Sequence, residues 1–457
     1  MSHSTLESAL QAAKNPVDLL RNSQIGPYAF PVVRHEFTNW RDEQRSWRET
    51  CALFDQSHHM TDLYVEGPDA LRVFSDLGVN TFKGFKPNTA KQFIACAPNG
   101  FVIGDAILFY FGENKFNLVG RPPAENWVQY HVESGKYNAT CERDERSAAN
   151  QGRRKTFRFQ VQGPHAVKVM EKVTGKSAPD IKFFHMDVFQ IAGLDVRALR
   201  HGMVGQPGWE LFGPWEDGDA VRDAIVAAGR EFGIHQVGAR TYPTSCLESG
   251  WIPSPMPAIY TGDELKPYRE WLKGTSYEAM ASLGGSFYSN NIEDYYLTPY
   301  DLGYGPFVKF DHDFIGRAAL ENIARDQRRK KVTLVWNGDD VERALGTLFH
   351  GQGEVAKYLD LPLANYSTLP YDQVLQHGKL VGLSTYTGYT FNERAMISLA
   401  MVDNALAVPG EQVTLIWGEE GGGSSKPTVE HHRQIEIRAT VAAAPYGEIA
   451  RVAYRPK

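Results

Sequence analysis

Gly202-Met203-Val204-Gly205-Gln206-Pro207-Gly208-Trp209-Glu210-Leu211 is the stretch that says most about how this chain folds. Its three glycines recur at three-residue spacing, and an aromatic residue and Glu210 follow them on an expected strand. Three further stretches stand out with it: residues 53–60 with 65–70, residues 99–105 with 118–121, and residues 238–240 with 248–251. Their interpretation depends on the strands and helices predicted around them.

A unit of strand, Gly-Pro turn and helix occurs twice in the first half of the chain. In the first copy, the β-rich run 63–65 precedes Gly67-Pro68, and apolar residues then recur at helical spacing over 70–77. The second copy covers 157–174 and turns at Gly163-Pro164. The first half of the chain therefore mixes strands and helices.

Two hairpins are predicted, at 106–119 with a turn at Gly112-Glu113-Asn114 and at 188–199 with a turn at Ala192-Gly193. A helix is expected over 216–230. Elements in this mixed order indicate an α+β fold rather than a doubly wound parallel sheet.

Three other parts of the chain differ in composition and in expected secondary structure. Residues 1–50 are polar and are expected to be helical. Residues 253–300 are rich in Pro, Tyr, Ser and Asn and are expected to form a long excursion packed on the surface. From about residue 331 short strands dominate and indicate a small β-barrel or sandwich. Those strands are predicted at 332–336, 380–386, 413–417, 435–440 and 450–454.

Composition excludes several classes of protein. The chain has 457 residues and a mass of 51.2 kDa, which at roughly 150 residues per domain indicates about three domains. Its 48 basic and 54 acidic side chains give a net charge of −6, so neither nucleic acid nor an anionic membrane is an expected partner. No apolar run has the length of a membrane span or the form of a signal peptide, and the four cysteines are scattered, so we expect a cytoplasmic protein.

Common catalytic and metal-binding motifs are absent. There is no Walker A loop, no HExxH and no GxSxG motif. His58-His59 and His431-His432 are adjacent pairs, and neighbouring residues of a strand face opposite ways, so neither pair suits one metal ion. No metal site is expected.

The stretches above resemble the folate-binding aminomethyltransferase family, to which the T-protein of glycine cleavage belongs. The family pattern Phe-Asp-x-Ser-His-Met matches residues 54–60, where this chain has one additional histidine, and Val-x-Gly-Pro-Asp-Ala matches residues 65–70. Its Gly-x-x-Gly-x-x-Gly-aromatic-Glu pattern matches residues 202–210. A second Gln-Gly-Pro turn at 162–164 and the linker at 304–320 also match, so the resemblance covers about residues 50–455 in the family's order.

This resemblance implies a three-domain cloverleaf of the α+β class with folate in a central channel and a C-terminal β-barrel. Residues 1–60 with 150–250 are then the folate-binding lobe. Residues 61–149 with 251–330 are a second lobe that carries an inserted excursion at 253–295. Residues 331–457 are the barrel. The cofactor implied is tetrahydrofolate, with no flavin, nicotinamide or metal.

Departures from the T-protein pattern indicate a particular branch. The T-protein has two adjacent aspartates before the hairpin, whereas this chain has Gly104 and Asp105, and it has an Asn where this chain has Arg121. A lost acid and a gained cation imply an anionic substrate rather than an amine. Together with insertions at 241–245 and 253–295, these features resemble the tetrahydrofolate-dependent aromatic O-demethylases, which act on vanillate, 3-O-methylgallate or syringate. No carrier protein is then expected as a partner.

The implied reaction moves a methyl group from an aryl ether to N5 of tetrahydrofolate. The phenolate is a poor leaving group unless a donor protonates it, and a tyrosine, with a pKa of about 10, matches a phenol. Tyr242, in the branch-specific insertion, is the candidate general acid. The alternative is that Tyr242 donates no proton and only orients the substrate or the folate. His59 is the second catalytic candidate.

The resemblance also implies the binding residues. Arg121 is the candidate for gripping the substrate carboxylate with its planar guanidinium. His59 and Gln56 are candidates for the ring's polar edge, and Tyr28 for an aromatic wall of the pocket. The cofactor-binding candidates are Glu210 for the pterin, with Gln162 and Trp251 for amide and stacking contacts. Each of these residues could instead have a purely structural role.

Two other functions fit the sequence. One is a demethylase of another small carboxylate, such as dimethylsulfoniopropionate, whose sulfonium group is already activated and needs no tyrosine donor. The other is a non-catalytic folate-binding module, which a retained Glu210 and a missing acid would allow. Arg121 and the inserted Tyr242 segment argue against that module, because a pure folate binder needs neither.

Overall fold

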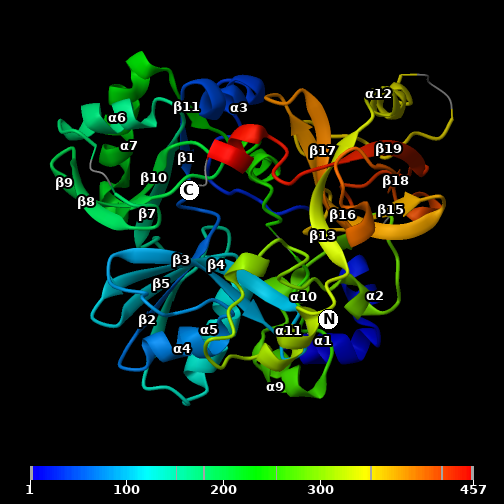
Figure 1. The fold of residues 1–457 in the computed structure, drawn as a ribbon, viewed down its shortest axis with the longest axis horizontal. Coiled ribbons are helices and arrows are strands. Elements are labelled where there is room, and N and C mark those ends of the chain that lie inside the picture. Colours follow the sequence, from blue (N-terminus) through cyan, green and yellow to red (C-terminus); the bar gives the residue numbers. More distant parts are fainter. Residues whose placement is uncertain are drawn as a thin grey trace.

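The fold is that of a computed structural model, which describes residues 4–150, 152–178, 181–253, 255–349, 353–423 and 426–453. Two sheet-and-helix lobes lie one above the other, and a β-barrel lies beside them (Figure 1). The expected α+β class with a C-terminal barrel is confirmed. In the described residues, no helix is long and apolar enough to cross a membrane.

The first lobe is a six-stranded sheet in the order β11-β1-β7-β10-β9-β8. Its strands are β1 (Cys51–Asp55), β7 (Thr156–Gln162), β8 (Met186–Ile191), β9 (Leu194–Arg200), β10 (Gly208–Pro214) and β11 (Ile234–Val237). β1 and β11 are parallel, and the other pairs are antiparallel. Helices α6 (Ala166–Thr174) and α7 (Gly218–Gly229) contact each other, and α3 (Trp40–Glu49) contacts β1 and β11.

The second lobe is a five-stranded antiparallel sheet in the order β3-β4-β5-β2-β6. Its strands are β2 (Thr61–Glu66), β3 (Thr89–Cys96), β4 (Val102–Gly112), β5 (Lys115–Gly120) and β6 (Thr140–Asp144). Helix α5 (Pro122–Glu133) contacts β4, β2 and β5, and helix α4 (Ala70–Leu77) contacts α5. Both predicted hairpins are confirmed, as β4–β5 and β8–β9.

The repeated unit of strand, Gly-Pro turn and helix is present as β2–α4 and β7–α6. Its two glycines, Gly67 and Gly163, have the same φ of +131°. A Cβ on Gly67 would lie 2.7 Å from the Asn138 carbonyl oxygen, and one on Gly163 would lie 2.6 Å from that of Thr50. Only glycine fits both the backbone angle and the close approach, so the two turns are built in the same way.

The C-terminal part forms a closed barrel in the order β13-β17-β16-β15-β18-β19. Its strands are β13 (Arg329–Trp336), β15 (Asp372–Gln376), β16 (Lys379–Thr390), β17 (Ala395–Asp403), β18 (Gln412–Trp417) and β19 (Ile435–Ala442), and α12 (Gly338–Gly346) contacts β19 and β17. The strand predicted at 450–454 is wrong, because Ile449–Ala453 is a helical turn. β13 pairs with β19 and closes the barrel, so no edge is left for another strand; Tyr454 lies outside the described residues.

Residues 1–50 are helical only in part. Helices α1 (Leu6–Ala13) and α2 (Pro16–Arg21) precede an irregular segment over 22–39. α1 contacts α9 (Lys266–Trp271) and α10 (Tyr277–Met280), and α2 contacts β12 (Leu283–Gly284), which pairs with β14 (Leu369–Pro370). These helices therefore pack on the excursion.

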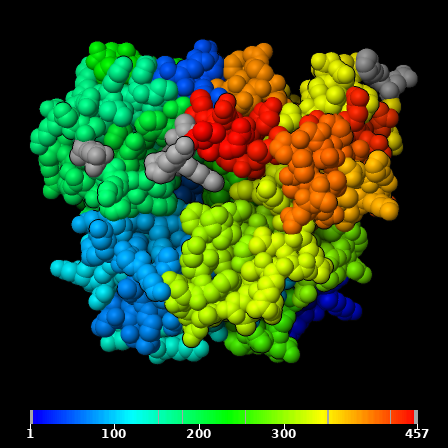
Figure 2. Space-filling view, viewed as in Figure 1, coloured from blue at the N-terminus to red at the C-terminus, as the bar shows by residue number. Residues whose placement is uncertain are grey.

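The excursion is more than a surface layer. Its Met256, Ile259, Tyr295 and Leu297 have no exposed surface, and they belong to the same core as the second lobe. Figure 2 shows the excursion and the linker that contains α11 (Arg317–Ile323) filling the space beside the second lobe. Two short elements, the 3₁₀ turn Tyr242–Thr244 and α8 (Ser245–Ser249), lie between the lobes and the barrel.

Candidate active site

Three of the residues expected in the site meet beyond the end of β1. Gln56 directly follows that strand, His59 lies in the turn before β2, and Tyr242 begins a short 3₁₀ turn. Gln56 Nε2 donates to Tyr242 Oη over 3.0 Å. The Tyr242 ring centroid lies 4.8 Å from that of His59 and 4.9 Å from that of Phe30. All three polar side chains are buried, so the fold brings together residues far apart in sequence.

Burial sets the protonation of this group. It raises the pKa of Tyr242 well above its ordinary value, so the phenol keeps its proton. Burial, and next the charge of Arg121, lowers the pKa of His59 well below its ordinary value, so the imidazole is neutral. Because Tyr242 Oη accepts from Gln56, its own proton is left for another acceptor, and the weak contact to Met203 Sδ at 3.9 Å is the one it makes here.

Two atoms of this group have no partner. Gln56 Oε1 and His59 Nδ1 are buried and make no hydrogen bond within the described part of the chain. A buried polar atom without a partner costs about 1–3 kcal/mol. Such atoms around one point indicate a site that a polar ligand completes.

Arg121 lies at the end of β5 and caps α5. Its guanidinium stands 4.1 Å from the Tyr28 ring centroid, and no carboxylate or hydrogen-bond acceptor among the described residues pairs with it. The Tyr28 hydroxyl donates to the backbone carbonyl of His59. Arg121 is therefore a cation held against an aromatic ring at the edge of the Gln56–His59–Tyr242 group.

A second cation stands at the same ring. The Arg146 guanidinium lies 5.3 Å from the Tyr28 ring centroid. Burial raises the pKa of Tyr28, and Arg121 and Arg146 oppose that rise. Sequence reasoning missed Arg146, because it lies in a loop after β6 without a motif, and only the folded chain brings it to Tyr28.

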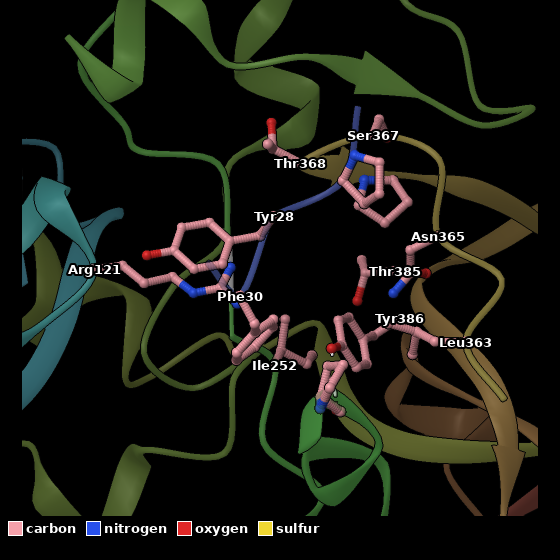
Figure 3. Close-up of a pocket in the computed structure, with 13 residues that line it drawn as sticks. Tyr28, Phe30, Arg121, Ile252, Leu363, Asn365, Ser367, Thr368, Thr385 and Tyr386 are labelled. Atoms are coloured by element: carbon pink, nitrogen blue, oxygen red, sulfur yellow. Dashed lines mark hydrogen bonds between the residues drawn. The ribbon is translucent and has the colours of Figure 1, made fainter. Parts of the chain in front are cut away.

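A small cavity opens beside Arg121 and Tyr28 (Figure 3). Phe30, Ile252 and Tyr386 form an apolar floor, and residues of the barrel segment, among them Asn365 and Thr385, form the far wall. Its enclosed volume is about 30 Å³, enough for water. An aromatic acid therefore needs side chains at its mouth to move.

Glu210 lies on β10 within a buried ion network. Its carboxylate pairs with Arg158 and lies 3.6 Å from His201 Nδ1. Arg158 also pairs with Asp62 over 2.9 Å. Burial alone would raise the pKa of Glu210, but Arg158 and His201 outweigh it and hold the pKa below its ordinary value. Glu210 is therefore a fixed anion with a defined orientation.

Gln162 lies beside this network with one amide hydrogen bond made and one missing. Its Oε1 accepts from the Met203 backbone N–H over 2.8 Å, whereas its Nε2 is buried and has no partner among the described residues. Gln160, two residues earlier on the same face of β7, has a buried Oε1 that likewise lacks a partner in the described part of the chain. Sequence reasoning missed Gln160, although its two-residue spacing from Gln162 was a usable signal.

The acceptor on β10 and the open donor on the neighbouring strand β7 match the polar groups of a pterin. A pterin edge offers both N–H groups and carbonyl or ring-nitrogen acceptors, and Glu210 accepts while Gln162 Nε2 donates. Met203 contacts both sets of polar residues. Its backbone N–H donates to Gln162, beside Glu210, and its sulfur lies 3.5 Å from Gln56 Nε2, in the group that contains Tyr242.

Trp251 lies elsewhere in the site. Its indole N–H donates to Asp105 Oδ2 at 3.1 Å and to Tyr304 Oη at 2.8 Å. Asp105 Oδ2 also accepts from Gln92 and Tyr304, and burial raises the pKa of this carboxyl. Because its N–H is engaged, the ring face of Trp251 is what remains for a ligand.

Gly104, which stands where the T-protein pattern has an acid, is closed to any side chain. A Cβ there would lie 2.9 Å from the Ala124 backbone nitrogen. β4 and α5 touch at this point, so the side chain of an acid here would clash with α5. The glycine is therefore required by the packing of the lobe, in addition to any effect on the chemistry.

His58 and His59 have separate surroundings. His58 Nδ1 lies 2.8 Å from Ser147 Oγ, and its ring packs on Trp215, whereas His59 packs on Phe30 and Tyr242. Over the described ranges, no group of three His, Cys, Asp or Glu side chains is placed to hold a metal ion.

The chain is similar to known proteins along most of its length. A family model described as the GCVT N-terminal domain matches residues 21–254. A syringate O-demethylase of Sphingobium sp. is 51% identical over 98% of this chain and 97% of that protein. A sesamin methylene transferase of Sinomonas sp. is 28% identical over 92% of each. Glycine cleavage system aminomethyltransferase T from Bartonella henselae has the same fold, with a TM-score of 0.60 at 17% identity over 93% of this chain and 92% of that one.

Proposed function

This chain belongs to the GCVT aminomethyltransferase family, and on that premise we propose that it is a tetrahydrofolate-dependent O-demethylase of methoxylated aromatic acids. The overall reaction breaks an aryl O–CH₃ bond and the N5–H bond of tetrahydrofolate, and it forms an N5–CH₃ bond and a phenol O–H bond. The products are a phenol and 5-methyltetrahydrofolate, and the proton lost by N5 balances the proton gained by the phenol oxygen. Syringate is the first substrate to test, because the relative that is 51% identical carries that name.

The observation that carries the proposal is Arg121. Its guanidinium has no carboxylate partner in the described chain and stands 4.1 Å from the Tyr28 ring centroid, and its charge acts on the pKa of Tyr242, which burial raises. A guanidinium in such a place binds a carboxylate through two parallel hydrogen bonds and so orients the ring that bears it. An aminomethyl donor, which is an amine, does not call for this cation.

Tyr242 supplies the proton. Its Oη accepts from Gln56 Nε2, so its own hydrogen is directed to the oxygen that departs from the methyl group. Burial keeps the phenol protonated until that oxygen gains charge. A donor placed in this way contributes about 10²–10⁴-fold to the rate. Neutral His59 and the free carbonyl of Gln56 are then available to bond the ring's hydroxyl.

Glu210, Gln162 and Gln160 would hold the pterin, and the ring face of Trp251 would contact the folate. Tetrahydrofolate, when bound, supplies N5 as the acceptor of the methyl group. The chain's own part is to orient: Arg158 and His201 fix the Glu210 carboxylate, and the Met203 backbone fixes the Gln162 amide.

The proposal includes no carrier protein, nucleic acid or membrane as a partner. It also includes a cytoplasmic location, which the four free cysteines Cys51, Cys96, Cys141 and Cys246 support. A non-catalytic folate module is disfavoured, because it requires neither the Arg121 cation nor a proton donor at Tyr242. A dimethylsulfoniopropionate demethylase is disfavoured, because two guanidiniums at Tyr28 oppose a sulfonium cation.

An anaerobic assay tests the proposal. The protein is incubated with tetrahydrofolate and, separately, with syringate, vanillate, 3-O-methylgallate and dimethylsulfoniopropionate. We expect 5-methyltetrahydrofolate and the matching phenol with at least one aromatic acid. Methylated folate from the sulfonium compound alone would overturn the substrate class, and none at all with folate still bound would favour the non-catalytic module.

A further inference from the structure

We propose that Asn365, in the barrel segment, is a specificity-determining residue whose side-chain amide donates a hydrogen bond to a ring oxygen remote from the substrate carboxylate. This inference rests on the proposed function, since it concerns the same aromatic acid. It goes further by assigning the reading of the ring's oxygenation pattern to the C-terminal part of the chain.

Asn365 is held firmly in one orientation. The Ala364 backbone N–H donates to the Thr387 carbonyl over 3.0 Å, and the Thr387 N–H donates to Asn365 Oδ1 over 3.1 Å. These two bonds fix the segment against β16 and engage the oxygen of the amide. The nitrogen end is therefore the end left for a ligand.

That nitrogen has no partner. Asn365 is 8% exposed and lines the cavity beside Arg121, and its Nδ2 is buried without a hydrogen bond among the described residues. Neighbouring hydroxyls of the same wall are engaged: Thr385 Oγ1 donates to the Leu399 carbonyl over 3.3 Å, and Thr368 Oγ1 accepts from the Ser282 backbone N–H over 2.8 Å.

The cavity places this donor opposite the cation. In Figure 3, Arg121 and Tyr28 lie on one side of the cavity and Asn365 and Thr385 on the other. A carboxylate bound at Arg121 points the rest of its ring toward the barrel wall. The Asn365 amide then donates to a hydroxyl or methoxyl oxygen of the ring. A substrate with a hydrogen at that ring position offers no acceptor, so the hydrogen bond is not formed.

The expected effect is a change of preference between substrates. A hydrogen bond between uncharged groups contributes about 0.5–1.5 kcal/mol, so its loss changes a substrate ratio by about 2- to 12-fold. The wild type should favour syringate over 3-methoxybenzoate, whose ring carries a single oxygen. In Asn365→Asp, which keeps the acceptor for Thr387 and loses the donor, this ratio should fall by about 2- to 12-fold.

Two further variants make the test specific. Asn365→Ala should show the same fall, although it also loses the bond to Thr387. Thr385→Val, on the same wall, should keep the wild-type ratio, because its hydroxyl is already bonded to Leu399. The effect should lie in KM rather than kcat, and dissociation constants from calorimetry give the ratio even for an acid that is bound and not turned over. Thermal unfolding checks that each variant is folded.

The possible failures are distinguishable. If the wild type is active and Asn365→Asp keeps the wild-type ratio, the inference about Asn365 is wrong while the demethylase stands. If Thr385→Val changes the ratio as much as Asn365→Asp does, the effect belongs to the shape of the wall and the inference is likewise overturned. If the wild type methylates no folate from any aromatic acid, the proposed function fails and this inference fails with it.

Discussion

The side-chain amide of Gln56 donates to the hydroxyl of Tyr242 over 3.0 Å. This bond joins the end of β1 to a segment almost two hundred residues later, and it decides which way the Tyr242 proton can point. A hydroxyl that accepts from an amide keeps its own hydrogen for a third atom. This geometry supports the proposal that Gln56 orients the Tyr242 hydroxyl and that Tyr242 donates the proton.

Replacing Tyr242 by Phe removes that proton and little else. We expect kcat and kcat/KM to fall together by about 10²–10⁴-fold, with the dissociation constant for tetrahydrofolate unchanged. Tyr64→Phe is a matched control, because Tyr64 is a tyrosine of β2 whose hydroxyl bonds Thr156 away from the site. Steady-state kinetics and calorimetry measure the two quantities, and an unchanged kcat would remove Tyr242 from the chemistry.

Replacing Arg121 by Gln should weaken binding of the aromatic acid and leave folate binding intact. A hydrogen bond to a charged group contributes about 1.5–3 kcal/mol, so KM should rise by about 10- to 150-fold. Arg197→Gln is the control, since Arg197 stacks on Phe111 in a different cleft. The assay compares vanillate with guaiacol, which lacks the carboxylate, and an equal loss for both compounds would contradict the assignment.

Glu210→Gln tests the pterin site against the stability of its ion network. The variant should bind tetrahydrofolate about 10- to 100-fold more weakly. It should also lose stability, because Arg158 keeps only Asp62 as a charged partner. Asp62→Asn disturbs the same arginine from its other side, and it should lose comparable stability with a much smaller effect on folate affinity. Equal effects of both variants on that affinity would mean that Glu210 only supports the network.

Gly104→Ala tests the packing reason for the missing acid. A Cβ at this position lies 2.9 Å from the Ala124 nitrogen, and overpacking of this kind costs about 1–3 kcal/mol in the free energy of unfolding. Gly338→Ala is the control, because a Cβ there has open space and the backbone is helical. Denaturant unfolding compares the two. A Gly104→Ala protein as stable as the wild type would show that α5 can move away from β4.

His59 should make stability depend on pH. Its folded pKa lies well below the ordinary value, so between these two values the unfolded chain binds more protons than the folded one, and stability is lost as the pH falls. From about pH 7.5 to about pH 5.5 the loss due to His59 approaches about 1.4 kcal/mol. His59→Gln should lose less stability over that range in urea unfolding, and an identical loss would show that His59 is readily protonated in the folded state.

Local signals were enough to predict part of the fold. The two Gly-Pro turns and the hairpins β4–β5 and β8–β9 were predicted from residues within about a dozen positions of one another, because turn chemistry and alternation are local signals. The close approaches of Gly67 to Asn138 and of Gly163 to Thr50 join distant parts of the chain and were not predicted. No strand was predicted for β15 or β17, and the strand predicted at 450–454 is wrong, because closing the barrel depends on which edges are already paired.

In the candidate site, too, residues in local motifs could be predicted, whereas residues brought in by folding could not. Arg121 and Glu210 belong to short motifs and could be proposed from sequence. Arg146 and Asn365 lie outside any motif, and the proposed role of each rests on a contact or a missing partner that exists only after folding. Gln160 could have been proposed from its two-residue spacing from Gln162. The roles proposed for all of these residues stay predictions until the variants are measured.

The path of the methyl carbon distinguishes methyl transfer to folate from other routes of ether cleavage. Syringate labelled with carbon-13 in its methoxy groups is incubated anaerobically with the enzyme and tetrahydrofolate, and the products are followed by NMR. The account predicts that the label appears in the methyl group of 5-methyltetrahydrofolate, with one phenol formed for each methyl transferred. Label in methanol or formaldehyde, with the folate unmethylated, would contradict it.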